Sequence, residues 1–327
     1  MRSLCWLYLC LACASPLSAA DQVILATNWL AQPELGGFYQ ALADGTYARH
    51  GLDVTIKPGG PLVNNRPLLA FGKVDFLIGT NLIQPFDATK QQIPTKVVAA
   101  FFQKDPQCIL AHANGPWKSW EDLKQAPLLI GNSGRQTFFL WMHDAYGFPR
   151  ANLRPYNHAL APFLNDKQMA MQGFATAEPE RIREANGTKT RVFLLADQGW
   201  NSYSTLLETR SELITKNPKL VQRFVDASII GWNTYLDAED TDAADVLIKR
   251  DNPSMSDGLI AFSRRKMNEL RLLEGGDAAT KGIGAIDVER VKSFYAKMVA
   301  AGMYEHDTLD PAAAVTQEFV NRGVGVE

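Results

Sequence analysis

The chain has 327 residues, a length that allows one large or two medium domains with a substantial core. Hydrophobic residues make up 46% and charged residues 21% of the chain, an ordinary globular composition that argues against disorder. The formal net charge of -2, without a basic stripe that carries interleaved aromatic residues, argues against a nucleic-acid-binding protein.

The N-terminus has the pattern of a secretory signal. Arg2 supplies a positive charge, residues 4–14 form an apolar run, and residues 18–20 are small, as at a cleavage site. The apolar run is too short to span a bilayer comfortably. We therefore expect cleavage after Ala20 and a mature protein in the periplasm.

Cleavage would leave a single cysteine. Cys5, Cys10 and Cys13 depart with the signal, so the mature chain keeps Cys108 and forms no intramolecular disulfide. The apolar neighbours of Cys108 predict a small buried core residue, and no positioned base suggests a catalytic thiol. A lipid anchor on Cys13 is less favoured, because Cys10 stands where such motifs usually carry Leu.

Residues 23–61 predict a complete β-loop-α-loop-β unit. Residues 23–26 are an apolar run typical of a strand buried in a parallel sheet, residues 37–50 predict a helix, and residues 52–56 alternate like a second strand. Ligands of open α/β sheets bind beyond the carboxyl ends of the strands, so the loop after the first strand is the first place to look for a site. The candidates in this unit are Asn28, Trp29, Glu34 and Tyr39.

This unit also resembles a known family. The aromatic after the first strand, the Gly-aromatic-Tyr helix start, "GLDVTI", "PGGP" and the segment "LAFGKVDF" at residues 69–76 are similar to periplasmic substrate-binding proteins of ABC importers. The class is the one grouped with thiamine-pyrimidine-synthase-like proteins, whose members carry pyrimidine precursors, riboflavin, sulfonates or similar solutes. The resemblance extends to about Asp197. It implies an α/β fold of the type 2 periplasmic binding class, with two lobes and a hinge of two crossovers.

A second buried strand is predicted at residues 74–79. Thr80 and Asn81 stand at its carboxyl end, beside the loop that carries Asn28. Both side chains are candidates for hydrogen bonds to a ligand.

The chain is expected to pass between two lobes twice. After a helix at 81–90 and a strand at 96–102, Pro106 breaks the pattern and an apolar run follows without a helix. A second direct passage is expected at residues 203–207. These passages divide the chain into a signal peptide at 1–20, lobe 1 at 21–106 and 203–327, and lobe 2 at 107–202. In lobe 1, helices are predicted at 217–236, 238–250, 254–273, 287–301 and 311–320.

Residues 131–137 form a second informative loop, between a predicted strand at 127–130 and a predicted helix at 137–146. The N-terminal N–H groups of that helix point at the loop, and Arg135 offers two donors to an anionic group. The alternative is a surface turn with a solvated Arg135. The candidates here are Ser133, Arg135 and Gln136.

Glu178 follows a predicted strand at residues 173–176. In the family that the chain resembles, a similar "N-E-P" element lines the cleft, but Ala177 replaces the Asn here. Glu178 remains as an acceptor for an amine or a ring N–H. It is equally suited to be a helix N-terminal charge favoured by the helix dipole.

Motifs for cofactors and catalysis are missing from the sequence. It contains no Walker-type loop, no GxGxxG and no GxSxG, and its five histidines lack the spacing of a metal site. We therefore expect no catalytic residues, no cofactor and no metal.

An aromatic plate with amide, hydroxyl and carboxylate partners suits a flat nitrogen heterocycle better than a bare oxyanion. We therefore expect a monomeric extracytoplasmic protein that captures a small solute, such as a thiamine pyrimidine precursor or a flavin-like compound. It would deliver that solute to the membrane subunits of an ABC permease.

Two alternatives stay open. One is an enzyme similar to eukaryotic pyrimidine synthases, which is disfavoured by the secretory signal, the single mature cysteine, and Glu34 where the active-site His would be sought. The other is a periplasmic partner that presents its ligand to a sensor kinase.

Overall fold

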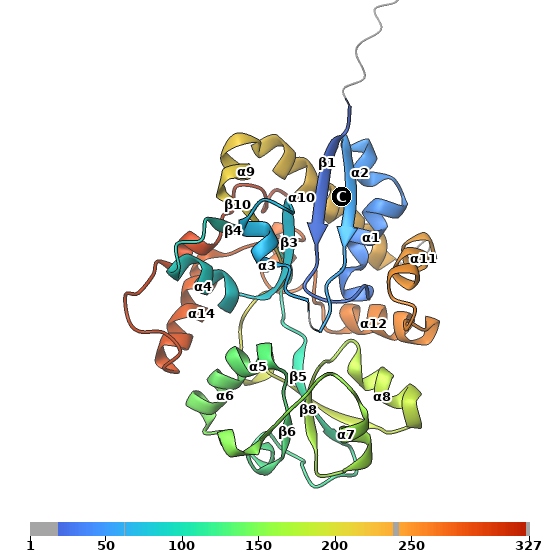
Figure 1. Cartoon of the computed structure of the whole chain (residues 1–327), viewed down its shortest axis with the longest axis vertical. Coiled ribbons are helices and arrows are strands. Elements are labelled where there is room, and N and C mark those ends of the chain that lie inside the picture. Colours follow the sequence, from blue (N-terminus) through green and yellow to red (C-terminus); the bar gives the residue numbers. More distant parts are fainter. Residues whose placement is uncertain (1–18, 62, 238–241, 325–327) are drawn as a thin grey trace, which may run out of the picture.

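The computed structural model describes residues 19–61, 63–237 and 242–324. It contains two five-stranded sheets, with strand orders β2-β1-β3-β10-β4 and β7-β6-β8-β5-β9. Figure 1 shows each sheet with its helices as a separate lobe, here called lobe 1 and lobe 2. Nearly all of the predicted signal peptide, at residues 1–18, lies outside the described residues.

The opening unit folds as predicted, with one difference. β1 (Asp21–Ala26) and β2 (Leu52–Lys57) are parallel, with Leu25 opposite Ile56. The predicted single helix is two helices, α1 (Gly36–Ala43) and α2 (Thr46–Arg49). The left-handed φ of 76° at Gly45 separates them, since a helix cannot continue through that conformation.

The remaining strands of lobe 1 form a mixed sheet. β10 runs antiparallel between β3 and β4, with Leu206 opposite both Gly79 and Ala100. The elements are η1 (Pro33–Leu35), α3 (Arg66–Ala70), β3 (Phe76–Asn81), α4 (Ile83–Lys90), β4 (Thr95–Phe102) and β10 (Ser204–Arg210).

Lobe 2 is built on β5 (Gln107–His112), which pairs antiparallel with β8 (Ala170–Phe174) and β9 (Thr190–Leu194). Cys108 of β5 is fully buried, so its prediction as a core residue is confirmed. The remaining elements are η2 (Asp122–Gln125), β6 (Leu128–Leu129), α5 (Asn132–Gln136), α6 (Phe138–Tyr146), η3 (Arg150–Asn152), β7 (Leu153–Arg154), α7 (Ala161–Asn165), α8 (Glu178–Asn186) and η4 (Ala196–Gln198).

The C-terminal helices belong to lobe 1 (Figure 1). They are α9 (Ser211–Lys216), α10 (Pro218–Asp237), α11 (Asp242–Asp251), α12 (Asp257–Glu269), α13 (Ala278–Lys281) and α14 (Val288–Ala300). α10 packs against α1 so closely that a Cβ on Gly231 would lie 2.2 Å from the carbonyl oxygen of Gly37. Glycine is therefore required where these helices meet. No helix within the described ranges is suited to spanning a membrane.

The predicted helix at residues 311–320 is wrong. Only η5 (Pro311–Ala314) is helical. Val315 forms a parallel bridge with Val97, and the N–H of Thr316 donates to the Val97 carbonyl at 2.9 Å. The segment therefore satisfies its backbone against β4 instead of continuing a helix.

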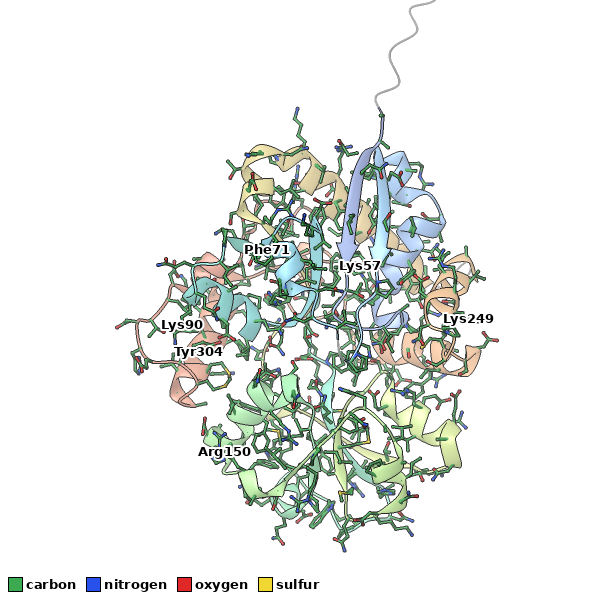
Figure 2. The ribbon with its side chains drawn as sticks, in the orientation of Figure 1. Lys57, Phe71, Lys90, Arg150, Lys249 and Tyr304 are labelled. Atoms are coloured by element: carbon green, nitrogen blue, oxygen red, sulfur yellow. The ribbon has the colours of Figure 1, made fainter. Side chains whose placement is uncertain are left out.

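Lobe 1 also holds the segment after α14 against α4. The Tyr304 hydroxyl donates to Asp87 at 2.8 Å, and Nζ of Lys90 lies 6.0 Å from the centroid of the Tyr304 ring. Lys90 and Tyr304 are labelled together in Figure 2. These contacts keep the segment after α14 on lobe 1.

The chain crosses between the sheets after β4 and again after β9. The return passage ends before Ser204, which already pairs with Asn81 and Phe102, so the predicted passage at 203–207 lies too far along the chain. At the first crossing, Asp105 accepts hydrogen bonds from the N–H of Gln107 at 3.0 Å and from the indole N–H of Trp200 at 2.9 Å. A buried carboxylate thus joins the two crossings.

Candidate functional site

The lobe 1 side of the candidate site lies at the carboxyl ends of β1 and β3. The Asn28 amide donates to the Thr80 hydroxyl at 2.7 Å, and both residues are half-buried. Thr27 fixes the loop that follows β1. Its hydroxyl donates to the Trp29 carbonyl at 2.7 Å and accepts from the N–H of Gly59, which lies just beyond β2, at 3.0 Å. These two hydrogen bonds hold the backbone at Trp29 in place.

Trp29 faces His158 of lobe 2. The two ring centroids lie 4.7 Å apart at an interplanar angle of 63°, and the centroid of the Tyr156 ring lies 4.8 Å from that of His158. Burial, assisted by the charge of Arg181, lowers the pKa of His158, which favours a neutral ring. No motif in the sequence marks His158 as a site residue. Its left-handed φ of 66° is a feature of the backbone that a sequence does not show.

Glu34 is buried where η1 meets lobe 2. One carboxyl oxygen, Oε1, accepts a hydrogen bond from the Thr176 hydroxyl. Within the described residues, the other oxygen, Oε2, has no hydrogen-bond partner. Burial raises the pKa of Glu34 from 4.5 to about 7, and the negative charge of Glu178 adds to this effect. Glu34 is therefore a proton-binding group at the boundary between the lobes.

The predicted loop of lobe 2 is arranged around Arg135. Its Nε donates to the Ile130 carbonyl at 2.7 Å and its Nη2 to the Arg154 carbonyl at 2.5 Å. The predicted loop is wrong over most of its length, because Asn132–Gln136 form α5, in which Ser133 and Gln136 are exposed. Arg135 thus ties the end of β6 to the end of β7, and these two donors are not directed at an anion.

Three other candidates make hydrogen bonds within their own lobes. Glu178, in the first turn of α8, accepts from the N–H of Phe174 at 2.7 Å and from Arg181 at 2.9 Å. Asn81 is buried and accepts from the N–H of Ile83 at 3.1 Å, next to the start of α4. Tyr39 is fully buried in the core of lobe 1, with its hydroxyl donating to Asp251 at 3.0 Å.

The structure therefore brings together Asn28, Trp29 and Thr80 on one side and His158 on the other. Glu34 accepts a hydrogen bond from Thr176 and lies close enough to Glu178 to be affected by its negative charge. Tyr39 is not part of either group. Thr176 was missed because its role depends on a contact between lobes, which periodicity does not reveal.

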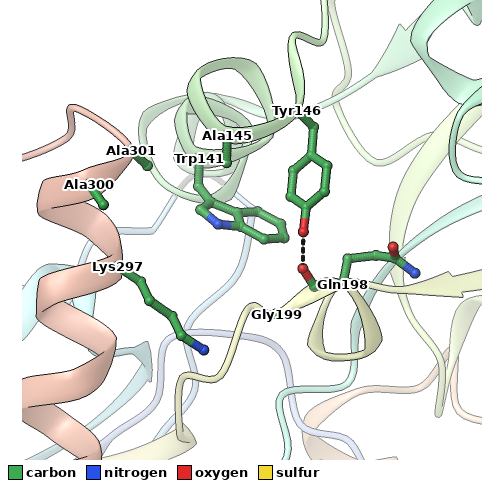
Figure 3. A pocket seen from close by; sticks show the side chains of 8 residues that line it. All are labelled: Trp141, Ala145, Tyr146, Gln198, Gly199, Lys297, Ala300 and Ala301. Atoms are coloured by element: carbon green, nitrogen blue, oxygen red, sulfur yellow. Dashed lines mark hydrogen bonds between the residues drawn. The ribbon is translucent and has the colours of Figure 1, made fainter.

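Two cavities in the described part of the chain lie away from these residues. One, with a volume of about 270 Å³, lies between α6 and α14 and is lined by Trp141, Tyr146 and Lys297 (Figure 3). The other, of about 430 Å³, lies at the crossings and is lined by Gln103, Lys104 and Arg290. Neither of these two cavities is lined by a predicted site residue.

The described residues contain no group of three His, Cys, Asp or Glu side chains able to hold a metal ion. The side chains that meet between the lobes offer an indole, an imidazole, an amide, hydroxyls and a protonatable carboxyl. This set can stack on a ring and exchange hydrogen bonds with its polar edge.

Comparisons with known proteins agree with this architecture. Over 316 residues the chain is 27% identical to the riboflavin-binding protein RibY of Chloroflexus aurantiacus, covering 93% of this chain and 87% of RibY. Among solved structures, it resembles the alkanesulfonate-binding protein SsuA from Xanthomonas axonopodis pv. citri, with a TM-score of 0.64 and 14% identity over 91% of this chain and 99% of SsuA.

A Candida albicans protein whose structure is described as the generic periplasmic binding protein fold has a TM-score of 0.61 and 16% identity, over 91% of this chain and 96% of that one. The predicted fold class is thereby confirmed. The desulfurization enzyme DSZB has the same fold, with a TM-score of 0.58 and 14% identity over 91% of this chain and 97% of that one. The fold alone therefore does not distinguish a binding protein from an enzyme.

A family model shows which family the sequence belongs to. The model described as NMT1/THI5 like matches residues 32–241, more than half of the chain. The match begins three residues after Trp29 and includes Glu34, Thr80, His158 and Thr176. The chain belongs to the NMT1/THI5 like family.

Proposed function

We propose that this protein is a periplasmic solute-binding protein that holds a flat nitrogen heterocycle between its lobes and delivers it to an ABC permease. The observation that carries the proposal is the ring pair of Trp29 and His158, one from each lobe, beside the Asn28–Thr80 hydrogen bond. The family match and the similarity to a riboflavin-binding protein support the same class of ligand.

Binding would proceed by opening and closing. In the structure the two rings touch, so a ligand ring enters when the lobes part and separate Trp29 from His158. Closure then places the ligand against Trp29, with Asn28 and Thr80 available for its polar edge. Because contacts from both lobes form together, the ligand stabilises the closed state.

The proposed contacts fall into two groups. Direct contacts with the ligand are assigned to Asn28, Trp29, Thr80 and His158, and further contacts to the exposed Ser133 and Gln136. Supporting parts are assigned to Glu34, Tyr39, Asn81, Arg135 and Glu178, each of which already makes a hydrogen bond within the protein.

The remaining predictions belong to the same proposal. The chain acts as a monomer with lobe 1 at residues 21–106 and 203–327 and lobe 2 at 107–202. It needs no catalytic group, because transport requires only capture and release. A sensory role in place of import would appear as a receptor kinase gene, instead of permease and ATPase genes, beside the gene for this protein.

Equilibrium titration of the purified full chain tests the function. Riboflavin and an aminopyrimidine precursor of thiamine are the probes, and quenching of tryptophan fluorescence is the readout. Saturable binding of either probe at one site per chain supports the proposal. A linear, non-saturating response to both, in a protein with a cooperative unfolding transition, would argue against a heterocycle ligand.

A further inference from the structure

Thr176 connects the lobes through both its side chain and its backbone. It lies just beyond β8 of lobe 2 and is fully buried. Its hydroxyl donates to Glu34 of η1, and its carbonyl accepts from the Ser263 hydroxyl of α12 at 2.7 Å. Both partners belong to lobe 1, so these hydrogen bonds can exist only while the lobes are together.

These hydrogen bonds lie at the edge of the boundary where α8 of lobe 2 meets α12 of lobe 1 (Figure 1). On the same edge, the Ser256 hydroxyl donates to Glu184 of α8 at 2.7 Å. On the opposite edge, α6 and α14 are separated by the cavity in Figure 3, where the Tyr146 hydroxyl donates to Gln198 within lobe 2. The edge between α8 and α12 therefore carries hydrogen bonds that hold the lobes together.

The surroundings of Glu34 disfavour a negative charge. The titratable groups that face it are Glu178 of α8 and Tyr235 of α10. Behind Tyr235, Arg264 of α12 lies 5.3 Å from the ring centroid and pairs with Asp245 of α11 at 3.1 Å. The positive charge of Arg264 is thus already paired with the Asp245 carboxylate. An ionised Glu34 would keep Oε2 buried without a donor, next to the negative charge of Glu178.

We propose that Glu34 and Thr176 form a proton-operated latch: the lobes close as Glu34 takes up a proton and part as Glu34 loses it. The latch regulates the site of the proposed function and rests on that hinged binding mode. In the closed state, Oε2 of Glu34 carries the proton and Oε1 accepts from the Thr176 hydroxyl. When the lobes part, Thr176 and α8 no longer cover Glu34. Water can then solvate the Glu34 carboxylate.

The sign of the effect follows from linkage. Burial in the closed state raises the pKa of Glu34 to about 7, whereas a solvated carboxyl has its ordinary value of 4.5. The closed state therefore binds the proton more tightly, and closure takes up one proton between these pH values. Closure becomes more favourable as the pH falls through about 7 and gains nothing further below 4.5.

The distance between the lobes in the ligand-free protein tests the latch. Fluorophores are attached to Lys57→Cys on lobe 1 and Arg150→Cys on lobe 2, two exposed positions labelled in Figure 2. The native Cys108 is buried and is not expected to react. The mean interlobe distance, measured by energy transfer from pH 8 to pH 4.5, should shorten as the pH falls.

Two variants separate the latch from general acid effects. Glu34→Gln, which is neutral at every pH, should remove the pH dependence and stay closed at pH 8. Glu184→Gln is the matched control, because Glu184 accepts a hydrogen bond at the same edge but is exposed. It should keep the wild-type profile. A wild-type distance that does not change with pH, or the same pH dependence in Glu34→Gln, would overturn the proposal.

A third pair of variants does not alter the charge. Thr176→Val removes the hydroxyl donor and should lengthen the mean distance at pH 5, whereas Thr176→Ser keeps the donor and should match the wild type. Equal distances in Thr176→Val and wild type would refute the latch. Since no ligand is added, these results do not depend on whether a heterocycle binds, and a failed titration with riboflavin leaves them interpretable.

Discussion

Replacing Trp29 by Ala should weaken ligand binding far more than it weakens folding. Trp29 is half-buried, and its ring contact in the structure is the edge-on one with His158. Such a pair contributes about 0.5–1.5 kcal/mol beyond its buried area. Loss of about 1 kcal/mol lowers the melting temperature by only about 2–4 °C in a domain of 150–250 residues, and by less in a longer chain.

The binding free energy should fall by more than the folding free energy. The indole face would stack on the ligand ring and also bury apolar surface of the ligand. We expect a loss of at least about 1.4 kcal/mol, which corresponds to a tenfold increase in Kd. Calorimetric or fluorescence titration with riboflavin measures the affinity, and a thermal scan of the ligand-free protein measures stability.

Trp117→Ala is the matched control. Trp117 is also half-buried, and its indole N–H donates to the Gln168 carbonyl at 2.6 Å, within lobe 2 and away from the candidate site. It should leave Kd unchanged. The reasoning fails if Trp29→Ala unfolds the ligand-free protein while the folded remainder keeps wild-type affinity, since Trp29 would then be a core residue.

Three further predictions concern stability and processing. The free energy of unfolding should fall as pH rises from 4.5 to about 7, because the closed native state binds the Glu34 proton more tightly than the unfolded chain does. The difference is at most about 3 kcal/mol, since parting of the lobes solvates the Glu34 carboxylate, and urea unfolding of Glu34→Gln should show a flatter pH profile. Gly231→Ala should cost about 1–3 kcal/mol in chemical denaturation because its Cβ would meet the Gly37 carbonyl at 2.2 Å, while Gly60→Ala, whose Cβ would have no atom closer than 3.5 Å, should cost less; equal losses would contradict the packing argument. Intact-mass analysis of exported protein should give an N-terminus at Asp21, and a product that retained residues 1–20 would refute the predicted cleavage.

The local parts of the fold were predictable from the sequence because their signals are local. An apolar run, a helix and an alternating run in residues 23–57 are enough to define the pairing of β1 with β2. The same reasoning placed Asn28 beside Thr80, since both follow neighbouring strands and their side chains share a hydrogen bond.

The errors arose where tertiary contacts overrule local patterns. Residues 311–320 have helical character, but Val315 pairs with Val97 and the backbone is extended there. The return crossing was placed too late because the sequence of residues 203–207 suits a crossing segment and a paired strand equally well. The pairing of Ser204 with Asn81 and Phe102 shows that the strand has already begun.

The boundary between the lobes was the least predictable part. His158 and Thr176 lie far from Trp29 and Glu34 in the sequence, and their contacts depend on how two separate sheets face each other. The same holds for Arg135, whose predicted anion-binding donors are directed at the backbone carbonyls of Ile130 and Arg154. A residue type indicates which hydrogen bonds are possible, and the surrounding fold selects among them.

Native mass spectrometry of the full chain purified from periplasm tests the central claim most directly. The account predicts one small aromatic nitrogen heterocycle per chain, released on denaturation and identified by its mass, with the adduct reduced in Trp29→Ala and retained in Trp117→Ala. A ligand of another class, such as an aliphatic sulfonate or a bare oxyanion, bound equally by both variants, would contradict it.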